Sequence, residues 1–249
     1  MNEHSNLKRE LPAGPAILEI EAVRFEGQGE MSLSMNQFSS TVGAGELVKV
    51  SLQRRHDPRD AASLLIGLHH PPAGSIRYAG QDWLGRDYTR HFQMRSQIGR
   101  VFAGSAWIHN LTVRENLWLS MSHHGLATRR IKVNVKRWVQ RLAGPRGALV
   151  HQAMRKRPSS VEPSILQICQ FVRAVCNQPR LLLLERPFRF LVDDLYDRFV
   201  TAIDDLRSKG TGVVWFAGDG ADHELAFRGP IRHWPVVNDV LIGDGRATS

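Results

Sequence analysis

Cysteine is nearly absent from this sequence. Only Cys169 and Cys176 occur in 249 residues, seven positions apart in a segment that predicts a helix. That spacing puts both on one helix face, about 10 Å from each other, whereas a disulfide needs Cα atoms within about 7 Å. The sequence therefore excludes a disulfide-stabilised fold. It gives little support to a metal or redox site, and we expect both cysteines to pack in the core.

Long apolar runs are also lacking. No segment reaches the roughly 18 apolar residues of a membrane-spanning helix. Residues 1–15 contain Glu, Lys and Pro rather than the apolar stretch of a secretory signal. We therefore expect a cytoplasmic chain with a flexible tail at 1–15, which reaches a membrane only through a partner. The remaining residues can bury a substantial core, as one domain or two lobes.

Acidic residues are outnumbered, with 24 Asp and Glu against 33 Lys and Arg, for a net charge of +9. The basic excess concentrates in residues 129–141 and 146–157. Such a balance suits nucleic acid, an anionic membrane surface or an acidic partner. No helix-turn-helix, zinc-finger or RNA-binding aromatic signature accompanies it. A solvated face or one apposed to an anionic membrane is thus favoured over nucleic-acid binding.

Apolar strands alternating with helices are what the sequence does contain, and this predicts an α/β fold with a parallel sheet. Four leucines followed by an acid, Leu181–Glu185, predict a strand buried on both faces. We expect one helix between 17 and 102 and mainly helices between 105 and 160, interrupted near Gly144-Pro145. Further strands are predicted at 17–23, 47–51, 98–102 and 212–217, and helices at 164–177 and 196–209.

The stretch Leu181-Leu182-Leu183-Leu184-Glu185-Arg186-Pro187 resembles the Walker B strand of ATP-binding cassette (ABC) ATPases. That family has Asp and then Glu after the apolar run, where this chain has Glu185 and Arg186. The resemblance runs from about residue 17 to 246. It rests on further segments in matching order and spacing: Gly45-Glu46-Leu47-Val48, Ile98-Gly99-Arg100-Val101-Phe102, Leu111-Thr112-Val113-Arg114-Glu115-Asn116-Leu117, Arg173 to Pro179, and Gly243-Asp244-Gly245-Arg246.

The chain is thereby similar to the ATP-binding subunit of an ABC transporter. The resemblance implies a P-loop NTPase-like ABC ATPase fold: a mainly parallel sheet flanked by helices, an antiparallel β region and a helical subdomain. Residues 16–104 and 161–246 would form the RecA-like core with its N-terminal β region, and 105–160 the helical subdomain. It also implies a membrane permease and a second ABC ATPase subunit as partners, with residues 108–121 in the permease-docking groove.

A smaller similarity points to ATPases of Mla/MCE-type lipid transport. It rests on Glu115-Asn116-Leu117, His123-His124-Gly125-Leu126 and Arg146-Gly147-Ala148.

The segment in register with the family's phosphate-binding loop has no glycine. A P-loop needs glycines whose backbone N–H groups wrap phosphate, a Lys for the phosphates, and a Ser or Thr for magnesium. Asp57 as N-cap, Pro58 in the first helical position and Asp60 in the first turn instead predict a helix start capped by its own residues. The alternative is an anion site rebuilt by Arg54, Arg55 and Arg59. The residues in this register are Gln53, Arg54, Arg55, His56, Asp57, Pro58, Arg59 and Asp60.

The second phosphate-binding helix start of the family is altered in the same way. Its Leu-Ser-Gly-Gly-Gln signature, which faces the γ-phosphate across a dimer, aligns with residues 161–165. Glu162 adds negative charge there, Pro163 removes a backbone N–H, and Ile165 follows Ser164 where the family has an amide side chain. The pattern predicts a second self-capped helix start.

The remaining catalytic positions are also substituted. Ala103, Arg186 and Gly218 stand where the resemblance implies the Q-loop Gln, the catalytic Glu and the switch His. An arginine cannot accept a proton in catalysis. Phe25 is near the position of the aromatic residue that stacks on adenine, although a core role suits it equally. Glu185 is the one candidate metal ligand, and we expect it to pair with a nearby Arg or Lys.

These substitutions favour a degenerate nucleotide-binding-domain homologue, a pseudo-ATPase that acts as scaffold or regulator in an ABC transport complex. No cofactor is expected, with ATP and magnesium relevant only if binding is retained. One alternative is an active ATPase with unusual residues. Another is a basic module that binds nucleic acid or anionic lipid through residues 129–141.

Overall fold

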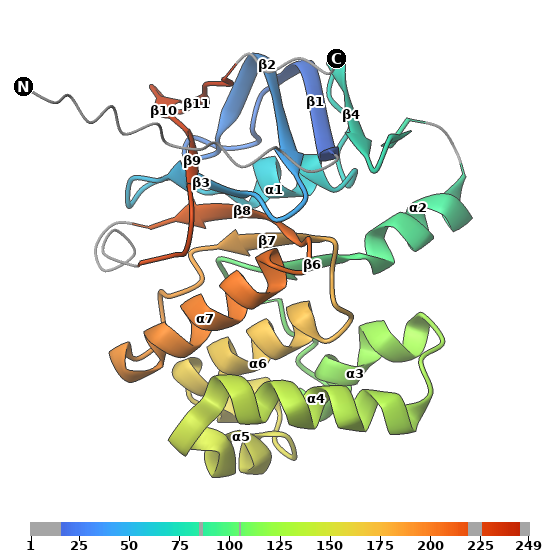
Figure 1. Cartoon of the computed structure of the whole chain (residues 1–249), viewed down its shortest axis with the longest axis vertical. Coiled ribbons are helices and arrows are strands. Elements are labelled where there is room, and N and C mark those ends of the chain that lie inside the picture. Colours follow the sequence, from blue (N-terminus) through green and yellow to red (C-terminus); the bar gives the residue numbers. More distant parts are fainter. Residues whose placement is uncertain (1–15, 85–86, 105, 219–225, 245–249) are drawn as a thin grey trace, which may run out of the picture.

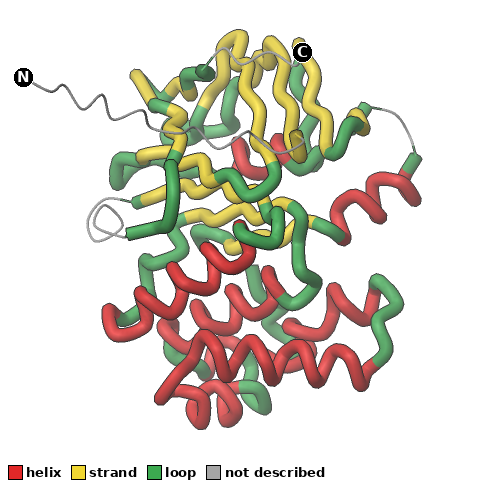
Figure 2. Tube along the Cα trace, viewed as in Figure 1, coloured by secondary structure: helices red, strands yellow, loops and turns green. Residues whose placement is uncertain are grey.

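A computed structural model describes residues 16–84, 87–104, 106–218 and 226–244. The strands gather at one end of the molecule and most helices at the other, as Figures 1 and 2 show. The predicted tail at 1–15 and residues 245 and 246 of the predicted terminal turn lie outside the described residues. No helix in these four ranges is both long and apolar enough to cross a bilayer.

The first sheet is mostly antiparallel and has the strand order β10-β11-β2-β1-β4-β5. Its long central strands β1 and β2 pair antiparallel with bulges, and β11 joins β2 in parallel. The strands are β1 (Ala16–Phe25), β2 (Ser34–Gly43), β4 (Ala73–Tyr78), β5 (Gln81–Asp82), β10 (Val236–Val237) and β11 (Val240–Leu241).

The second sheet is fully parallel, with the order β6-β7-β8-β3-β9. Every residue of β7 and β8 is buried, as expected for strands covered on both faces. Because the strands are parallel, their carboxyl ends share one edge of the sheet. The strands are β3 (Leu47–Ser51), β6 (Ile98–Val101), β7 (Leu181–Glu185), β8 (Gly212–Ala217) and β9 (Arg232–Trp234).

Two cores lie on opposite faces of the parallel sheet. On β7, Leu181 and Leu183 pack with the first helix and the antiparallel sheet, whereas Leu182 and Leu184 pack with the helical layer. The two faces are filled separately because successive side chains of a strand point to opposite sides. The helices are α1 (Arg59–Leu65), α2 (Tyr88–Ser96), α3 (Val113–His123), α4 (Thr128–Ala143), α5 (Gly147–Ala153), α6 (Pro163–Val175) and α7 (Tyr196–Arg207), with 3-10 turns at Gly144–Arg146, Pro158–Ser160 and Asp193–Leu195.

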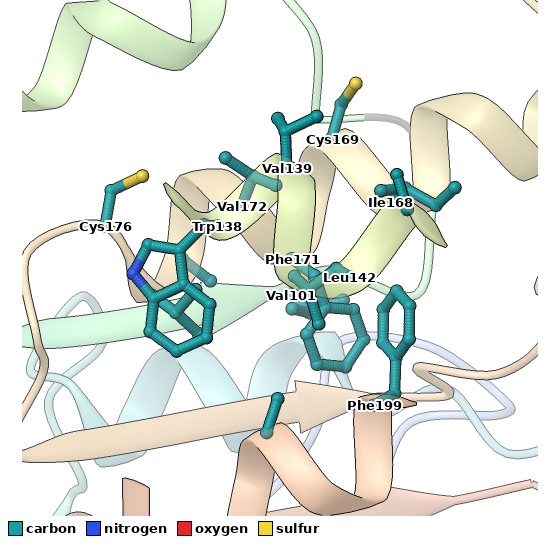
Figure 3. Close-up of a cluster of buried hydrophobic side chains, with 14 of the residues drawn as sticks. Val101, Trp138, Val139, Leu142, Ile168, Cys169, Phe171, Val172, Cys176 and Phe199 are labelled. Carbon is teal, nitrogen blue, oxygen red and sulfur yellow. The ribbon is translucent and has the colours of Figure 1, made fainter. Parts of the chain in front are cut away.

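Cys169 and Cys176 are buried and not bonded to each other, as predicted. Both belong to the core of the helical layer, which Figure 3 shows together with Trp138 and Val139 of α4 and Val172 of α6. Burial raises the pKa of each thiol to about 12.

Several element boundaries differ from the sequence-based expectations. Between residues 17 and 102 there are two helices rather than one. The helix that the sequence did not predict, α2, buries only His91 and Met94, so it has almost no apolar periodicity, and its start is fixed by the Asp87 carboxylate, which accepts a hydrogen bond from Arg90 N. The helices expected at 164–177 and 196–209 end earlier, at Val175 and Arg207.

Candidate functional site

The site predicted from the sequence lies at the carboxyl edge of the parallel sheet, where β3, β7 and β8 end. Glu185 ends β7 and is fully buried. Arg186 follows with φ of 44°, a left-handed conformation that is uncommon for a residue with a side chain. Its backbone N–H donates to Phe216 O on β8 at 2.9 Å. This sharp turn directs the Arg186 side chain toward the loop after β3.

The Arg186 guanidinium is held by backbone carbonyls of that loop. Its Nη2 donates to Gln53 O at 2.7 Å, to His56 O at 2.9 Å and to Arg54 O at 3.3 Å. A phosphate-binding loop presents backbone N–H groups to its anion. Here the loop turns carbonyl oxygens toward a bound cation, so its polarity suits a guanidinium rather than a phosphate.

His56 and Asp239 fix the same loop from the other side. The Gln53 backbone N–H donates to His56 Nδ1 at 3.1 Å, so Nε2 carries the ring proton and bonds Asp239 Oδ1 at 2.8 Å. Arg55 also pairs with Asp239, which lies between β10 and β11. The hydrogen bond from Arg55, followed by that from His56, holds the pKa of Asp239 below its ordinary value. The loop is thus tied to both sheets.

The helix after the loop begins differently from our expectation. α1 starts at Arg59 with Pro58 as its N-cap residue, one position later than predicted. Pro58 has helical dihedrals itself, so the difference is one of assignment at the first turn, and proline has no side-chain acceptor for a cap. Asp57 accepts a hydrogen bond from the Arg59 backbone N–H at 3.0 Å. Both of its carboxylate oxygens also accept hydrogen bonds from the Arg59 guanidinium. Burial alone would raise the pKa of Asp57, but the hydrogen bonds from Arg59 hold it below its ordinary value. Asp60 lies in the first turn and accepts from Gln28 N and Ser32 Oγ.

Glu185 is paired with an arginine, as predicted. Arg100 on β6 donates from Nε to Glu185 Oε1 at 2.5 Å, and the Ala103 backbone N–H donates to Oε2 at 3.2 Å. Burial raises the pKa of Glu185, and the Arg100 charge opposes that rise. Both carboxylate oxygens are engaged, and the described residues hold no cluster of three His, Cys, Asp or Glu that could bind a metal. A guanidinium therefore occupies the space beside Glu185 in which a cation would bind.

The Glu162–Ile165 segment begins α6 on the other face of the parallel sheet from α1. Glu162 is the N-cap residue and Pro163 the first helical residue, as expected. The prediction that Glu162 caps the backbone is wrong, because its carboxylate accepts the Ser164 hydroxyl at 2.8 Å instead. Ser164 and Ile165 are buried. Within one chain, this group is not part of the Arg186 site.

Two further predicted residues lie as follows. Phe25 is buried at the end of β1 and stacks on His69 with ring centroids 6.2 Å apart. Gly218 directly follows β8, whose last residue, Ala217, pairs with Ser51 at the end of β3. Gly218 is therefore at the same sheet edge as Glu185 and Arg186.

Sequence reasoning missed Arg100 and Asp239. Arg100 lies on β6, adjacent and parallel to β7, so a basic residue on that strand was the available signal. Asp239 comes from a turn far along the chain, and its approach to Arg55 and His56 follows only from the pairing of β11 with β2. No sequence signal connects them.

A separate groove of about 470 Å³ opens between α3 and α6. Arg173 reaches it from α6, donates to Ala106 O at 2.8 Å and stacks over the Trp107 ring. Burial lowers the pKa of Arg173 to about 10, and its Nη2 has no hydrogen-bond partner in the described part of the chain. The groove is lined by Ala106, Ile108, Asn116, Leu119, Ser120, His123, His124 and Arg173.

Comparisons with known proteins agree on one family. The family model for ABC transporters matches residues 61–189. The sulfate/thiosulfate import ATP-binding protein CysA 2 of Chromobacterium violaceum is 29% identical over 182 residues, 73% of this chain and 44% of that protein. The lipoprotein-releasing system ATP-binding protein LolD of Ruegeria pomeroyi is 30% identical over 144 residues, 57% of this chain and 60% of that protein. The chain spans about half the length of the first curated relatives that it matches.

Solved structures agree on the fold. The ATP-binding subunit of an ABC transporter superposes with a TM-score of 0.73 at 17% identity, covering 90% of this chain and 88% of that one. A dimeric bacterial ABC transporter cassette, MJ0796, gives a TM-score of 0.67 at 16% identity, covering 80% and 87%. The predicted fold class is confirmed, whereas the predicted domain boundaries stay a prediction.

Proposed function

The chain belongs to the ABC transporter family, and from that premise we propose that it acts as a pseudo-ATPase. It would be a nucleotide-binding-domain homologue that serves as scaffold or regulatory subunit of an ABC transport complex. It would fold, and present its partner surfaces, without nucleotide.

The observation that carries this proposal is the binding of the Arg186 guanidinium by the carbonyls of Gln53, Arg54 and His56. Phosphoryl transfer depends on positioning the phosphates and stabilising their charge. A loop that turns carbonyl oxygens inward would repel phosphate oxygens. ATP would also have to displace a side chain that already satisfies the loop.

Magnesium fits the site no better than phosphate. Glu185, the one candidate ligand, uses both oxygens in bonds to Arg100 and Ala103. Arg186 cannot act as the base that activates water, because a guanidinium stays protonated. The donor set therefore does not fit ATP with magnesium, and we assign no catalytic step to this chain.

An active ATPase is the second candidate, favoured by the family match over 61–189 and by relatives named as ATP-binding proteins. Under that hypothesis Arg54, Arg55 and Arg59 would rebuild an anion site. Two of the three are already neutralised, since Arg55 pairs with Asp239 and Arg59 with Asp57. This pairing weighs against the second candidate.

The proposed partners are a membrane permease and a second ABC ATPase subunit, identical or different. The groove beside Arg173 would receive the permease, and the protein would thus lie at the cytoplasmic face of the membrane. Glu162 and Pro163 at the start of α6 would impair a site completed with a second subunit, by negative charge and by the loss of a backbone donor. Lipid transport of the Mla/MCE type stays a prediction.

Isothermal titration calorimetry with Mg-ATP tests the proposal, with an ABC ATPase that has an intact phosphate loop as the positive control. We expect no binding heat and no shift in melting temperature, whereas a ligand present at 100 times its Kd would stabilise the fold by about 2.7 kcal/mol. Micromolar binding would overturn the proposal. ATP-dependent phosphate release, alone or with the permease, would instead establish the second candidate.

A further inference from the structure

The net positive charge of this protein belongs almost wholly to one part of it. Residues 105–160 contain eleven of the 33 Lys and Arg residues but only one of the 24 Asp and Glu residues, Glu115. The rest of the chain is nearly balanced. Glu115 forms no salt bridge with these cations in the described residues. Its carboxylate accepts hydrogen bonds from the Thr112 backbone and hydroxyl instead.

Only two of these eleven cations reach an acid elsewhere in the described chain. Arg141 on α4 pairs with Asp205, and Arg146 pairs with Asp194. The other nine side chains are exposed and form no salt bridge within the described residues. These nine are Arg114, Arg129, Arg130, Lys132, Lys136, Arg137, Arg155, Lys156 and Arg157.

Five of the nine lie on α4, which runs along the outer side of the helical layer, away from the sheets (Figure 1), and we call these five the basic face. At 100° per residue, Lys132, Lys136, Arg129, Arg137 and Arg130 follow one another around its solvent side. Val133 falls in the middle of this arc and is 59% exposed. The apolar stripe of α4 is buried in the protein core, so the helix can lie against a charged surface but cannot insert into it.

We propose that the basic face binds the phosphate headgroups of an anionic phospholipid membrane. The charges are complementary, and α4 presents five cations along about 12 Å of its axis. Val133 exposes an apolar group among them, which suits the headgroup boundary. No Phe, Tyr or Trp of residues 106–160 is exposed, so the described face lacks the stacking platforms typical of RNA and single-strand binding. The choice of lipid rests on the proposed function, since a transport subunit works beside a bilayer.

Sedimentation of the full chain with vesicles tests this proposal. Vesicles of phosphatidylcholine with phosphatidylglycerol should pellet the protein at low salt, and those of phosphatidylcholine alone should not. Binding should weaken as salt shortens the Debye length. A triple variant Lys132→Gln, Lys136→Gln, Arg137→Gln should lower the vesicle partition coefficient by roughly 100-fold, since each basic residue near an anionic surface contributes about fivefold.

The matched control removes the same charge elsewhere, through Arg24→Gln, Arg180→Gln and Lys209→Gln, which are all exposed. The vesicle partition coefficient of this control should fall by no more than a few-fold. Equal losses in both variants, or no binding by the wild type, would overturn the proposal. Tighter binding to a labelled DNA or RNA than to the vesicles at equal salt would replace lipid with nucleic acid. Neither variant touches residues 53–60 or 185–186, so the calorimetric result with Mg-ATP stands independently.

Discussion

Replacing Arg186 by glutamate distinguishes two accounts of the end of β7. If the site is a dormant ATPase, Arg186→Glu restores the family's catalytic carboxylate and should create activity. If the loop is built around a guanidinium, the same change puts a carboxylate against the carbonyls of Gln53, Arg54 and His56. We expect the second outcome, with loss of stability and no hydrolysis.

The size of the effect follows from the bonds that Arg186 makes. Two of them, at 2.7 and 2.9 Å, are short, and a hydrogen bond from a charged group contributes about 1.5–3 kcal/mol. Arg186 is only half-buried, so solvent compensates part of the loss. We expect Arg186→Ala to lower the free energy of unfolding by about 2 kcal/mol, or roughly 4–8 °C in Tm. Arg186→Glu should cost about 1 kcal/mol more, because it also repels the nearby Asp57.

A glycine variant separates the side chain from the backbone. Arg186 has φ of 44°, which alanine and glutamate tolerate no better than arginine. Glycine relieves that strain, so Arg186→Gly should be about 1 kcal/mol more stable than Arg186→Ala. Thermal unfolding followed by circular dichroism, with a phosphate-release assay on each variant, measures all of this. Hydrolysis by Arg186→Glu, or an alanine variant as stable as wild type, would refute the reasoning.

Three other predictions concern charges and thiols. Glu185→Gln should destabilise the fold by about 3–5 kcal/mol, since it leaves the buried Arg100 unpaired; Glu185→Leu with Arg100→Met should cost less, and urea denaturation gives both values. The lowered pKa of Asp57 means that its stabilisation is present above its ordinary pKa of 3.8 and is lost as pH falls through the folded-state value. Between pH 7 and pH 3, Asp57→Asn should therefore lose less stability than wild type, and equal losses would contradict the assignment. With thiol pKa values of about 12, Cys169 and Cys176 should resist iodoacetamide at pH 8 until denaturant is added, as mass spectrometry would show.

The sequence was sufficient to predict the central strands, but not the hydrogen bonds that the side chains at their carboxyl ends make. Leu181–Glu185 and Gly212–Ala217 were predicted to the residue, because a strand buried on both faces is continuously apolar. The missing glycines indicated that the loop after β3 differs from a phosphate loop. They could not indicate that its carbonyls face Arg186, since that depends on the turn at the end of β7.

The other two misses have different origins. Glu162 was expected to cap α6, but its carboxylate accepts from the neighbouring Ser164 hydroxyl instead of a backbone N–H, a choice between two local donors that the sequence does not decide. The partner of Glu185 was predicted only as some Arg or Lys. Its identity, Arg100, required the strand order β6-β7. Contacts that depend on the order of strands in a sheet could not be predicted from the sequence, whereas contacts that follow from the periodicity of apolar residues could.

The strand order also determines when this protein can fold during its synthesis. The neighbours of β3 are β8 and β9, which follow it by more than 160 residues, and Leu47 pairs with Val213. A nascent chain therefore carries β3 with two open edges until most of the polypeptide has left the ribosome. Such long-range pairing is slow, and unpaired apolar strands invite association with other chains. The parallel sheet can thus close only after β8 and β9 have been synthesised, and not while the first half of the sheet's sequence is growing.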